Sequence, residues 1–529
     1  MHRAEGRDAP DAPNAIARAA TLTSVGNLSS RVIGLVREMV KSFYFGNGQA
    51  ASAFELAANI PTQFYDLLIG GMLSSALVPT LSELADEGNP AARRAFGELL
   101  GALLGLTMLG LTLVIALLWL LALPIARFIS GGPNQDPHML AALLRITIPA
   151  ILFLNLSGIL TAALHARRRF AFTAFTATTH NAVMIVCVVL LEAQLGVMAL
   201  AGGLLVGSVA QVLIQLPGLR GVPVRFSLNW RLPGVRQVVR LFIPVAGGLV
   251  LAQLAVQVSF ILASRISAEG PATMRYAAQV IQFPLGMVAM AIAAAILPAL
   301  SSAQGEAFKR TLAQWMRLVW VLTAPATVGI YVLASPIVAL LFERGAFTAE
   351  STAYTAAALR AATPGLLFAA LDTLLIYAFY AQRDTRTPTT VGIVSTLFYL
   401  ALVGVQTLLD EVGARPFTLE SLVLANSLKT GVDAALMGLF LWRKIGGLRG
   451  YGLGETVVKV SLALTVMAPV AHFTMEALAA RFALHTFLGN VVIALGTAAV
   501  GALTYFVCAA LLRLGELNHL RALFAQRLA

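Results

Sequence analysis

The sequence predicts an all-α polytopic membrane protein with about fourteen transmembrane helices, in two pseudo-symmetric six-helix lobes (a parallel repeat) plus two C-terminal helices. Three observations predict this class: the composition, the recurrence of long apolar runs and an internal repeat. The chain of 529 residues is 58% hydrophobic and 12% charged, with a mean hydropathy of +0.81. Soluble domains carry about 25% charged residues and cannot expose this much apolar surface to water. The composition therefore excludes a soluble protein.

Long apolar runs recur from one end of the chain to the other. Each can cross about 30 Å of hydrocarbon, and each must be helical because no water satisfies backbone groups there. The period-2 alternation of a membrane β-barrel is absent. The expected spans are 16–44, 51–82, 94–126, 138–164, 171–192, 196–216, 237–264, 272–301, 312–341, 350–381, 388–409, 418–442, 454–480 and 485–512.

Basic residues orient these spans, since they gather in every second loop, including 165–170, 217–236, 302–311, 382–387 and 443–453. Lysine and arginine are enriched in cytoplasmic loops. The bias predicts a multi-pass inner-membrane protein with both termini in the cytoplasm. It also explains the net charge of +12 without a nucleic-acid partner.

An internal repeat relates the two halves of the chain. ALVPTLSELA (76–85) resembles AILPALSSAQ (295–304), and the prolines Pro79 and Pro298 are separated by nearly the same number of residues as Arg167 and Arg383. Two unrelated motifs with one offset indicate a duplicated six-helix unit of unchanged orientation. We expect a disordered N-terminus (1–13), an N-lobe (14–220), a C-lobe (221–450), two further helices (451–515) and a cytoplasmic tail (516–529). Two such lobes are typical of alternating-access transporters, with a channel as the alternative.

No catalytic motif is present. HExxH, GxSxG and Walker A patterns are missing, so we expect neither an enzyme nor a nucleotide-driven motor, and no metal or cofactor. Cys187 and Cys508 lie inside apolar spans and are interpreted as packing residues. His180, inside the fifth span, is interpreted as a core residue.

Ionisable residues within the spans are the candidates for function, because each costs about 2.5–3.5 kcal/mol in the membrane unless it is paired or hydrated. The first span carries Arg31, Arg37, Glu38 and Lys41, and Glu55 enters the second. This excess of cations predicts a hydrated cavity that attracts an anionic head group, because arginine suits phosphate. The alternative is that Arg31 and Lys41 reach the two membrane surfaces while Arg37 and Glu38 pack internally.

Other charges within the spans have simpler interpretations. Lys429 and Asp433 are four residues apart and can neutralise each other. Arg145, Arg360 and Asp372 are single charges, which either lie near a membrane–water interface or take part in function.

Six segments carry a resemblance to a known family: SRVIGLVREMV (30–40), FGNG (45–48), ALVPTLSE (76–83), QFPLGMVAMAIAAAILPALS (282–301), LFERGAFT (341–348) and YAQRDTRTP (380–388). In this order they resemble the MurJ (MviN) lipid II flippases of the MOP transporter superfamily. The resemblance implies transport of lipid II, the undecaprenyl-pyrophosphate-linked peptidoglycan precursor, from the inner to the outer leaflet for cell-wall synthesis. It implies a cationic cavity between the lobes, a groove for the lipid tail at spans 13 and 14, and support from membrane potential or an ion gradient. Expected partners are the lipid-linked anionic substrate, membrane lipids and the peptidoglycan synthesis machinery.

Some positions depart from the family pattern. The family has Asp where this chain has Ser52, Arg where it has Tyr65, Glu-Gly where it has Gly70-Gly71, and a cavity Arg where it has Gln279. Span 7 and the core of span 11 contain no acidic residue, so a sodium site of the family type is not expected. A flippase for another polyprenyl-linked saccharide, or a non-transporting envelope scaffold, therefore stays an alternative. The expected substrate-cavity residues are Arg31, Arg37, Lys41, Ser52, Glu55, Tyr65 and Gln279, and the expected conformational and loop residues are Pro79, Pro298, Glu343, Arg344, Gly345, Arg383 and Asp384.

Overall fold

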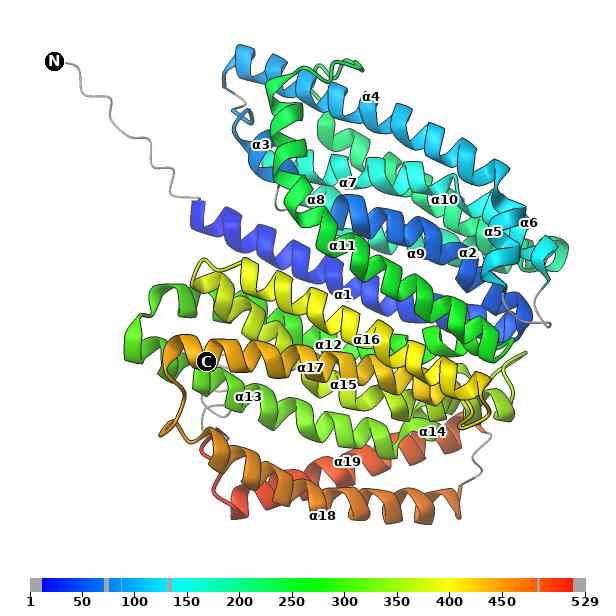
Figure 1. Ribbon diagram of the computed structural model, residues 1–529, viewed down its shortest axis with the longest axis vertical. Helices are drawn as coiled ribbons and strands as arrows, with labels where there is room; N and C mark the ends of the chain where they lie inside the picture. The colour runs from blue at the N-terminus through cyan, green and yellow to red at the C-terminus, as the bar shows by residue number, and fades with distance from the viewer. Residues whose placement is uncertain (1–11, 71–75, 87, 131–135, 483–485, 517–529) are drawn as a thin grey trace. The chain divides into compact units, whose positions relative to one another are not determined.

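The structure, a computed structural model, describes residues 12–70, 76–86, 88–130, 136–482 and 486–516. Throughout these ranges the regular elements are helices (Figure 1). Residues 1–11 of the predicted disordered N-terminus and residues 517–529 of the predicted tail lie outside them, and α1 begins at Ala12.

Within the described residues the helices group into fourteen segments, each overlapping one predicted span. Ten segments are apolar and long enough to cross a membrane by length and composition alone, within the described residues. The others, α1, α2, α12 and α17, include the most highly charged spans. The elements are α1 (Ala12–Phe45), α2 (Gln49–Tyr65), η1 (Asp66–Gly70), α3 (Val78–Ser82), α4 (Pro90–Leu120), α5 (Ala122–Ile129), α6 (Pro137–Thr147), α7 (Ala150–Ala166), α8 (Ala171–Ala174), α9 (Thr176–Leu195), α10 (Met198–Gln215), η3 (Leu216–Leu219), α11 (Pro233–Ile266), α12 (Gly270–Ser302), α13 (Gly305–Val332), α14 (Ala334–Phe342), α15 (Ala349–Ala381), α16 (Arg386–Glu411), α17 (Leu419–Ile445), α18 (Leu453–Ala479) and α19 (Phe487–Leu511).

Polar side chains begin several of these helices. The Thr348 hydroxyl accepts a hydrogen bond from the Ser351 amide at 3.2 Å, and Thr486 does the same for Gly489 at 3.1 Å. Asn89 accepts from the Ala91 amide at the start of α4. Such caps satisfy amides that have no partner within the first turn, so they define where each span starts.

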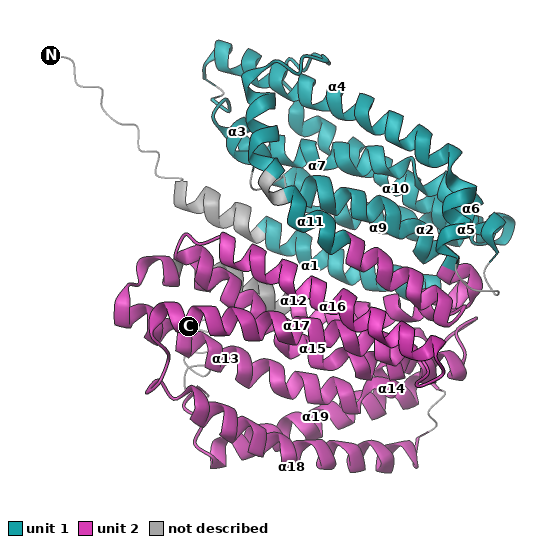
Figure 2. Ribbon diagram, in the orientation of Figure 1, with its two compact units in different colours: residues 1–41, 53–130, 135–253 teal, residues 42–52, 131–134, 254–529 magenta. Residues whose placement is uncertain are grey.

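The chain divides into two compact units (Figure 2). Unit 1 comprises residues 1–41, 53–130 and 135–253, and unit 2 comprises residues 42–52, 131–134 and 254–529. The predicted lobe boundaries at 220 and 450 stay a prediction.

Unit 1 has a core formed by α3, α4 and α7, with Leu77, Leu100 and Leu160 among its buried side chains. An extended segment follows η3 and packs on a glycine stripe of α4, where Ser227 donates its amide to the Gly101 carbonyl at 3.3 Å. A Cβ atom on Gly101 would lie 1.9 Å from the Arg225 carbonyl oxygen. The missing side chain therefore allows backbone to lie directly against the helix.

Unit 2 has one core among α12, α13, α15 and α17, with Phe308, Leu374 and Phe379 buried, and a second where α18 and α19 lie beside α13 (Figure 1). The hydroxyl of Tyr505 on α19 donates to the Val321 carbonyl of α13 at 2.9 Å. The last two spans therefore pack against α13, another helix of unit 2.

The same local geometry recurs at equivalent points of the two halves. The third span breaks at Leu121 (φ −86°, ψ 7°) in one half and at Leu333 (φ −87°, ψ 10°) in the other. The fourth span ends at a residue of positive φ in both, Arg168 at 56° and Arg383 at 58°. These matches agree with the predicted duplication and shift its alignment by one residue, from Arg167 to Arg168.

Pro79 lies in α3 and Pro298 near the end of α12, so both are close to the end of the second span of their half.

Candidate functional site

The charged residues of the first span meet a carboxylate from the second. The Lys41 ammonium group binds the carboxylates of both Glu38 and Glu55, and the Arg37 guanidinium binds Glu38. The side chains of Lys41 and Glu38 are only 2% and 1% exposed, whereas that of Arg37 is 18% exposed. Buried charges need such partners, since desolvation costs several kcal/mol per ion. Lys41 is thus an internal member of the cluster, and Arg37 is its accessible cation.

A polar residue of α9 holds the Arg37 guanidinium in place. Nη1 of Arg37 donates to Oδ1 of Asn181 at 2.9 Å, and Nδ2 of Asn181 donates to the Ser30 carbonyl at 3.4 Å. Gly34 lies beside this amide, with an ideal Cβ position 3.4 Å from Nδ2. Asn181 is not among the residues predicted from the sequence, although an asparagine inside an apolar span stands out there.

His180, the neighbour of Asn181, packs against Gly207 of α10, as expected of a core residue. Within the described residues, no group of three or more His, Cys, Asp or Glu side chains could hold a metal ion.

In the ion pairs described above, two cations (Arg37 and Lys41) meet two carboxylates (Glu38 and Glu55). The cationic excess expected of the first span is therefore offset by Glu55 from α2. Arg31, half-buried on α1, adds a further positive charge about 1.7 turns before Arg37.

The FGNG motif is hydrogen-bonded to α12 and α15 within unit 2. The side chain of Asn47, in the FGNG motif, donates to the Thr273 hydroxyl at 3.1 Å and accepts from the Ser351 hydroxyl at 2.7 Å. The Tyr276 hydroxyl donates to the Gly46 carbonyl at 2.8 Å. Asn47, Thr273 and Tyr276 are buried, so these hydrogen bonds satisfy polar groups that water does not reach. Gly46 and Asn47 of FGNG thus form a buried hydrogen-bonded junction with α12 and α15.

The FERGAFT motif forms the other side of this junction. The Arg344 guanidinium donates to the Leu340 carbonyl at 2.6 Å and lies over the Phe487 ring at 4.7 Å. Glu343 accepts from the Thr352 hydroxyl at 2.6 Å. Gly345 has a φ of +59°, and a Cβ atom there would lie 2.2 Å from the Phe43 carbonyl oxygen. These residues shape the loop between α14 and α15.

The positions that depart from the family pattern occupy separate places. The Ser52 hydroxyl is buried and accepts from the Ala272 amide at 3.3 Å, in the first turn of α12. Gln279 lies seven residues further along α12, about 10 Å away along the axis. Tyr65 packs against the core of unit 1. Gly70 ends η1, and Gly71 lies outside the described residues. Ser52 and Gln279 thus do not form a direct pair.

The loop after α15 is fixed by Asp384. Its carboxylate accepts from the Thr387 amide at 3.1 Å and binds the Lys444 ammonium at 2.8 Å. The hydrogen bond from Lys444, aided by the Thr387 amide, lowers the pKa of Asp384 to about 2. Arg383, next to it, has the positive φ described above and ends the helix.

The predicted pair on α17 has a third member. Lys429 and Asp433 lie near enough to Asp372 of α15 for all three to interact electrostatically. The two single arginines, Arg145 on α6 and Arg360 on α15, lie in different units.

An apolar cavity of about 360 Å³ lies between α13, α18 and α19, lined by Leu322, Ala498, Phe506 and their neighbours. The predicted tail groove at spans 13 and 14 falls on these helices.

Comparison with known proteins identifies relatives along most of the chain. The family model described as "Lipid II flippase MurJ" matches residues 41–493. "Probable lipid II flippase MurJ" of Vibrio cholerae serotype O1 is 33% identical over 401 residues, covering 72% of this chain and 75% of that protein. "Lipid II flippase MurJ" of Burkholderia cenocepacia is 30% identical over 390 residues, covering 71% and 75%.

Solved structures share the fold. A lipid II flippase MurJ in an inward closed conformation superposes with a TM-score of 0.78 at 22% identity, covering 93% of this chain and 98% of that one. An inward-facing multidrug resistance MATE family transporter of the MOP superfamily gives 0.64 at 15% identity, covering 79% and 95%. Taken with the family match and the motifs, these findings show that the chain is a multi-pass membrane protein that belongs to the MurJ family of lipid II flippases.

Proposed function

We propose that this chain moves lipid II from the inner to the outer leaflet of the cytoplasmic membrane by alternating access, for cell-wall synthesis. The observation that supports this most directly is the family match over residues 41–493, together with an accessible arginine in the first span. The termini are proposed to lie in the cytoplasm. Membrane potential or an ion gradient is proposed to support the cycle, and the peptidoglycan synthesis machinery to receive the product.

Arg37 is the group proposed to bind the pyrophosphate. Its guanidinium is oriented by Glu38 and Asn181, yet the side chain keeps 18% of its surface exposed. A preformed guanidinium suits two phosphate oxygens at once. Lys41 has two carboxylate partners and is nearly inaccessible, so its proposed part is to hold Glu38 and Glu55 in place.

The lipid tail is proposed to follow the apolar cavity between α13, α18 and α19.

Rescue of a flippase-depleted bacterium, with lipid II exposure measured on the outer leaflet, tests the proposal. Arg37→Ala should abolish rescue at unchanged membrane abundance, because losing a hydrogen bond to a charged group costs about 1.5–3 kcal/mol. Arg37→Lys should rescue partly, since a point charge remains. Arg94→Ala, an exposed arginine at the start of α4, is the control and should rescue fully.

The two alternatives give different results. A non-transporting scaffold would tolerate Arg37→Ala. A flippase for another polyprenyl-linked saccharide would require Arg37 but leave lipid II exposure unchanged when the chain is expressed.

A further inference from the structure

Arg145 and Arg360 occupy the same position in the two halves of the chain. Residues 144–153 read LRITIPAILF and residues 359–368 read LRAATPGLLF, so each arginine precedes a proline by four residues. The preceding span gives a second match, LLWLLALPI (117–125) with GIYVLASPI (329–337). This alignment pairs Trp119 with Tyr331 and Leu123 with Ser335.

The two arginines have different surroundings. In unit 1 the Arg145 guanidinium lies over the Trp119 ring, 5.3 Å from its centroid. In unit 2 the Arg360 guanidinium donates from Nη2 to the Ser335 hydroxyl at 2.9 Å. The duplication supplied one residue pattern, and the two halves use it differently.

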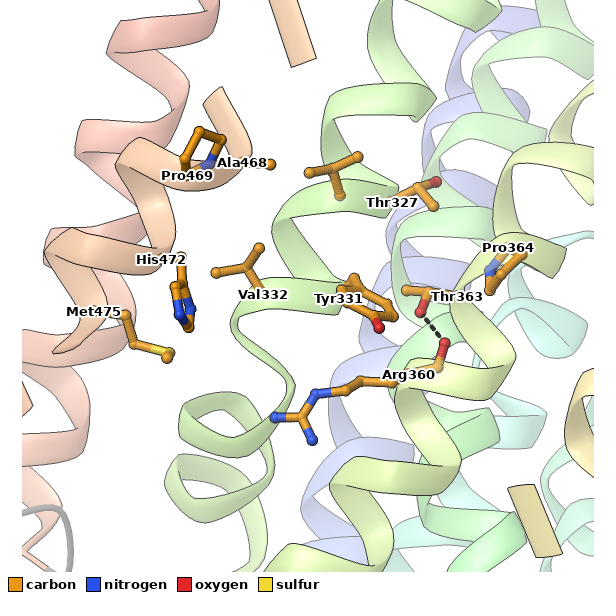
Figure 3. Close-up of a pocket in the computed structure, with 11 residues that line it drawn as sticks. Thr327, Tyr331, Val332, Arg360, Thr363, Pro364, Ala468, Pro469, His472 and Met475 are labelled. Atoms are coloured by element: carbon orange, nitrogen blue, oxygen red, sulfur yellow. Dashed lines mark hydrogen bonds between the residues drawn. The ribbon is translucent and has the colours of Figure 1, made fainter. Parts of the chain in front are cut away.

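Arg360 faces a pocket of about 590 Å³ between α13, α15 and α18. Figure 3 shows its guanidinium extending toward the side of the pocket where His472 and Met475 lie on α18. Tyr331 also lines the pocket, at the position where the other half has the stacking tryptophan. A pocket of this size is in the range of small-ligand sites.

Local backbone chemistry positions Arg360. Pro364 has no amide hydrogen to give to the Arg360 carbonyl, which instead accepts from the Thr363 hydroxyl at 2.6 Å (Figure 3). A second proline inside a helix, Pro469 of α18, lies on the opposite wall. Both walls therefore contain a proline that removes one backbone hydrogen bond from a continuous helix at the pocket.

The charge of Arg360 has no counterion within the described residues. Its side chain binds the Ser335 hydroxyl and no carboxylate. On α18, a carboxylate oxygen of Glu476 lies 3.3 Å from Nε2 of His472. A guanidinium has five N–H donors, and a charge inside a membrane-spanning helix is costly unless paired or hydrated. The pocket thus offers unused donors to an anion.

We propose that this pocket binds the phosphate of an anionic lipid, with Arg360 as the phosphate ligand and the apolar wall from Val332 to Met475 against the lipid's hydrocarbon. Arginine binds phosphate oxygens in a bidentate manner, and the pocket lies among membrane-spanning helices where lipid is the surrounding solvent. Arg360 lies about 16 Å along α15 from its first residue. On the predicted topology, that end of the helix faces the periplasm.

Native mass spectrometry of the full-length protein, loaded with phosphatidylglycerol or with phosphatidylcholine, tests the proposal. The wild type should retain phosphatidylglycerol preferentially, and Arg360→Gln should reduce this retention about tenfold or more. Arg145→Gln, the repeat-equivalent arginine outside the pocket, is the matched control and should retain as much lipid as the wild type.

A second variant keeps the arginine and changes its surroundings. Tyr331→Trp with Ser335→Leu copies the first half and should direct Arg360 onto the indole, with the same loss of phosphatidylglycerol. This result would show that the open guanidinium, and not a folding defect of Arg360→Gln, is responsible.

Two further ligands distinguish the sources of phosphate. If a polyprenyl pyrophosphate displaces phosphatidylglycerol, the site belongs to the transported class of lipid. If it does not compete, the site belongs to bilayer phospholipid. Both results support a site for a lipid phosphate. Displacement by millimolar inorganic phosphate would overturn the lipid assignment, and equal retention by Arg360→Gln would overturn the site. Rescue assays are scored separately, so a failure here leaves the proposed transport of lipid II testable through Arg37.

Discussion

The Lys41 ammonium group of α1 binds the Glu55 carboxylate of α2, and the two side chains are only 2% and 7% exposed. Lys41 also binds Glu38, which in turn binds Arg37. A buried cation thus connects the two carboxylates, one of which supports the accessible arginine. The first two spans are therefore coupled through charge as well as through apolar packing.

Removing Lys41 should be more harmful than removing Glu55. Lys41→Met removes the ammonium group that binds both Glu55 and Glu38, and breaking a buried ion pair costs about 3–5 kcal/mol. Glu55→Gln leaves Lys41 paired with Glu38 and should cost less. Thermal unfolding in detergent measures both. The double variant Lys41→Met/Glu55→Leu should recover part of the loss; an additive double-mutant cycle would contradict the coupling.

The glycine stripe of α4 gives a prediction with a control on the same helix. Gly101→Ala would place a Cβ atom 1.9 Å from the Arg225 carbonyl oxygen, so the extended segment must move away. We expect a loss of thermal stability of several degrees, since backbone cannot yield as a flexible side chain can. Gly110→Ala meets no atom within 4 Å and should be neutral or stabilising by up to about 1 kcal/mol. Equal effects at both positions would show that the stripe does not pack as described.

Asn47 should be required for the junction of unit 2. Asn47→Ala removes the acceptor of the Ser351 hydroxyl and the donor to the Thr273 hydroxyl, leaving buried groups unsatisfied at a cost of about 1–3 kcal/mol each. Asn47→Asp keeps the acceptor but loses the donor, and should have an intermediate melting temperature. Ser351→Ala, which removes one bond, is the reference for a single loss. A melting temperature of Asn47→Ala no lower than that of Ser351→Ala would argue against the double role.

Asp384 should make stability depend on pH in the acid range. Its pKa of about 2 in the folded chain is below the usual 3.8, so its stabilising effect is complete above about pH 4 and is lost as the pH falls toward 2. At neutral pH, Asp384→Asn should lower stability by about 1 kcal/mol, because the partly exposed ion pair and the hydrogen bond from the Thr387 amide are each modest. Unfolding followed from pH 7 to pH 2 should show the two proteins converging below pH 4. Lys444→Met should lose much of the same pH dependence, and a constant gap would exclude this carboxylate as the cause.

The topology is tested by single cysteines in the loops at 165–170, 302–311, 382–387 and 443–453, in a background with Cys187 and Cys508 replaced. An impermeant thiol reagent should label them only after the cytoplasmic membrane is opened, because basic loops are retained in the cytoplasm. A cysteine in the 343–348 loop is the control and should be labelled from the periplasm. Labelling of any basic loop in intact cells would reverse the proposed orientation.

Span positions and the duplication could be predicted because they depend on local properties. A stretch such as 94–126 crosses the membrane because of its own length and apolarity, and the structure places α4 and α5 there. The end of the fourth span likewise recurs at Arg168 and Arg383, since the chain repeats the local pattern that ends the helix. The family assignment followed from motifs of the same local kind and is confirmed by the match over residues 41–493.

What the side chains of these spans contact was decided by tertiary structure. Spacing on the first span indicated an excess of cations, but Glu55 from another helix balances Lys41, and Asn181, more than a hundred residues away, orients Arg37. Arg145 and Arg360 have equivalent sequence contexts, yet one stacks on Trp119 and the other binds Ser335 and opens on a pocket. The physical reason is that a charge in the membrane is stabilised by whatever group packing brings within a few ångströms, and no local pattern specifies that group.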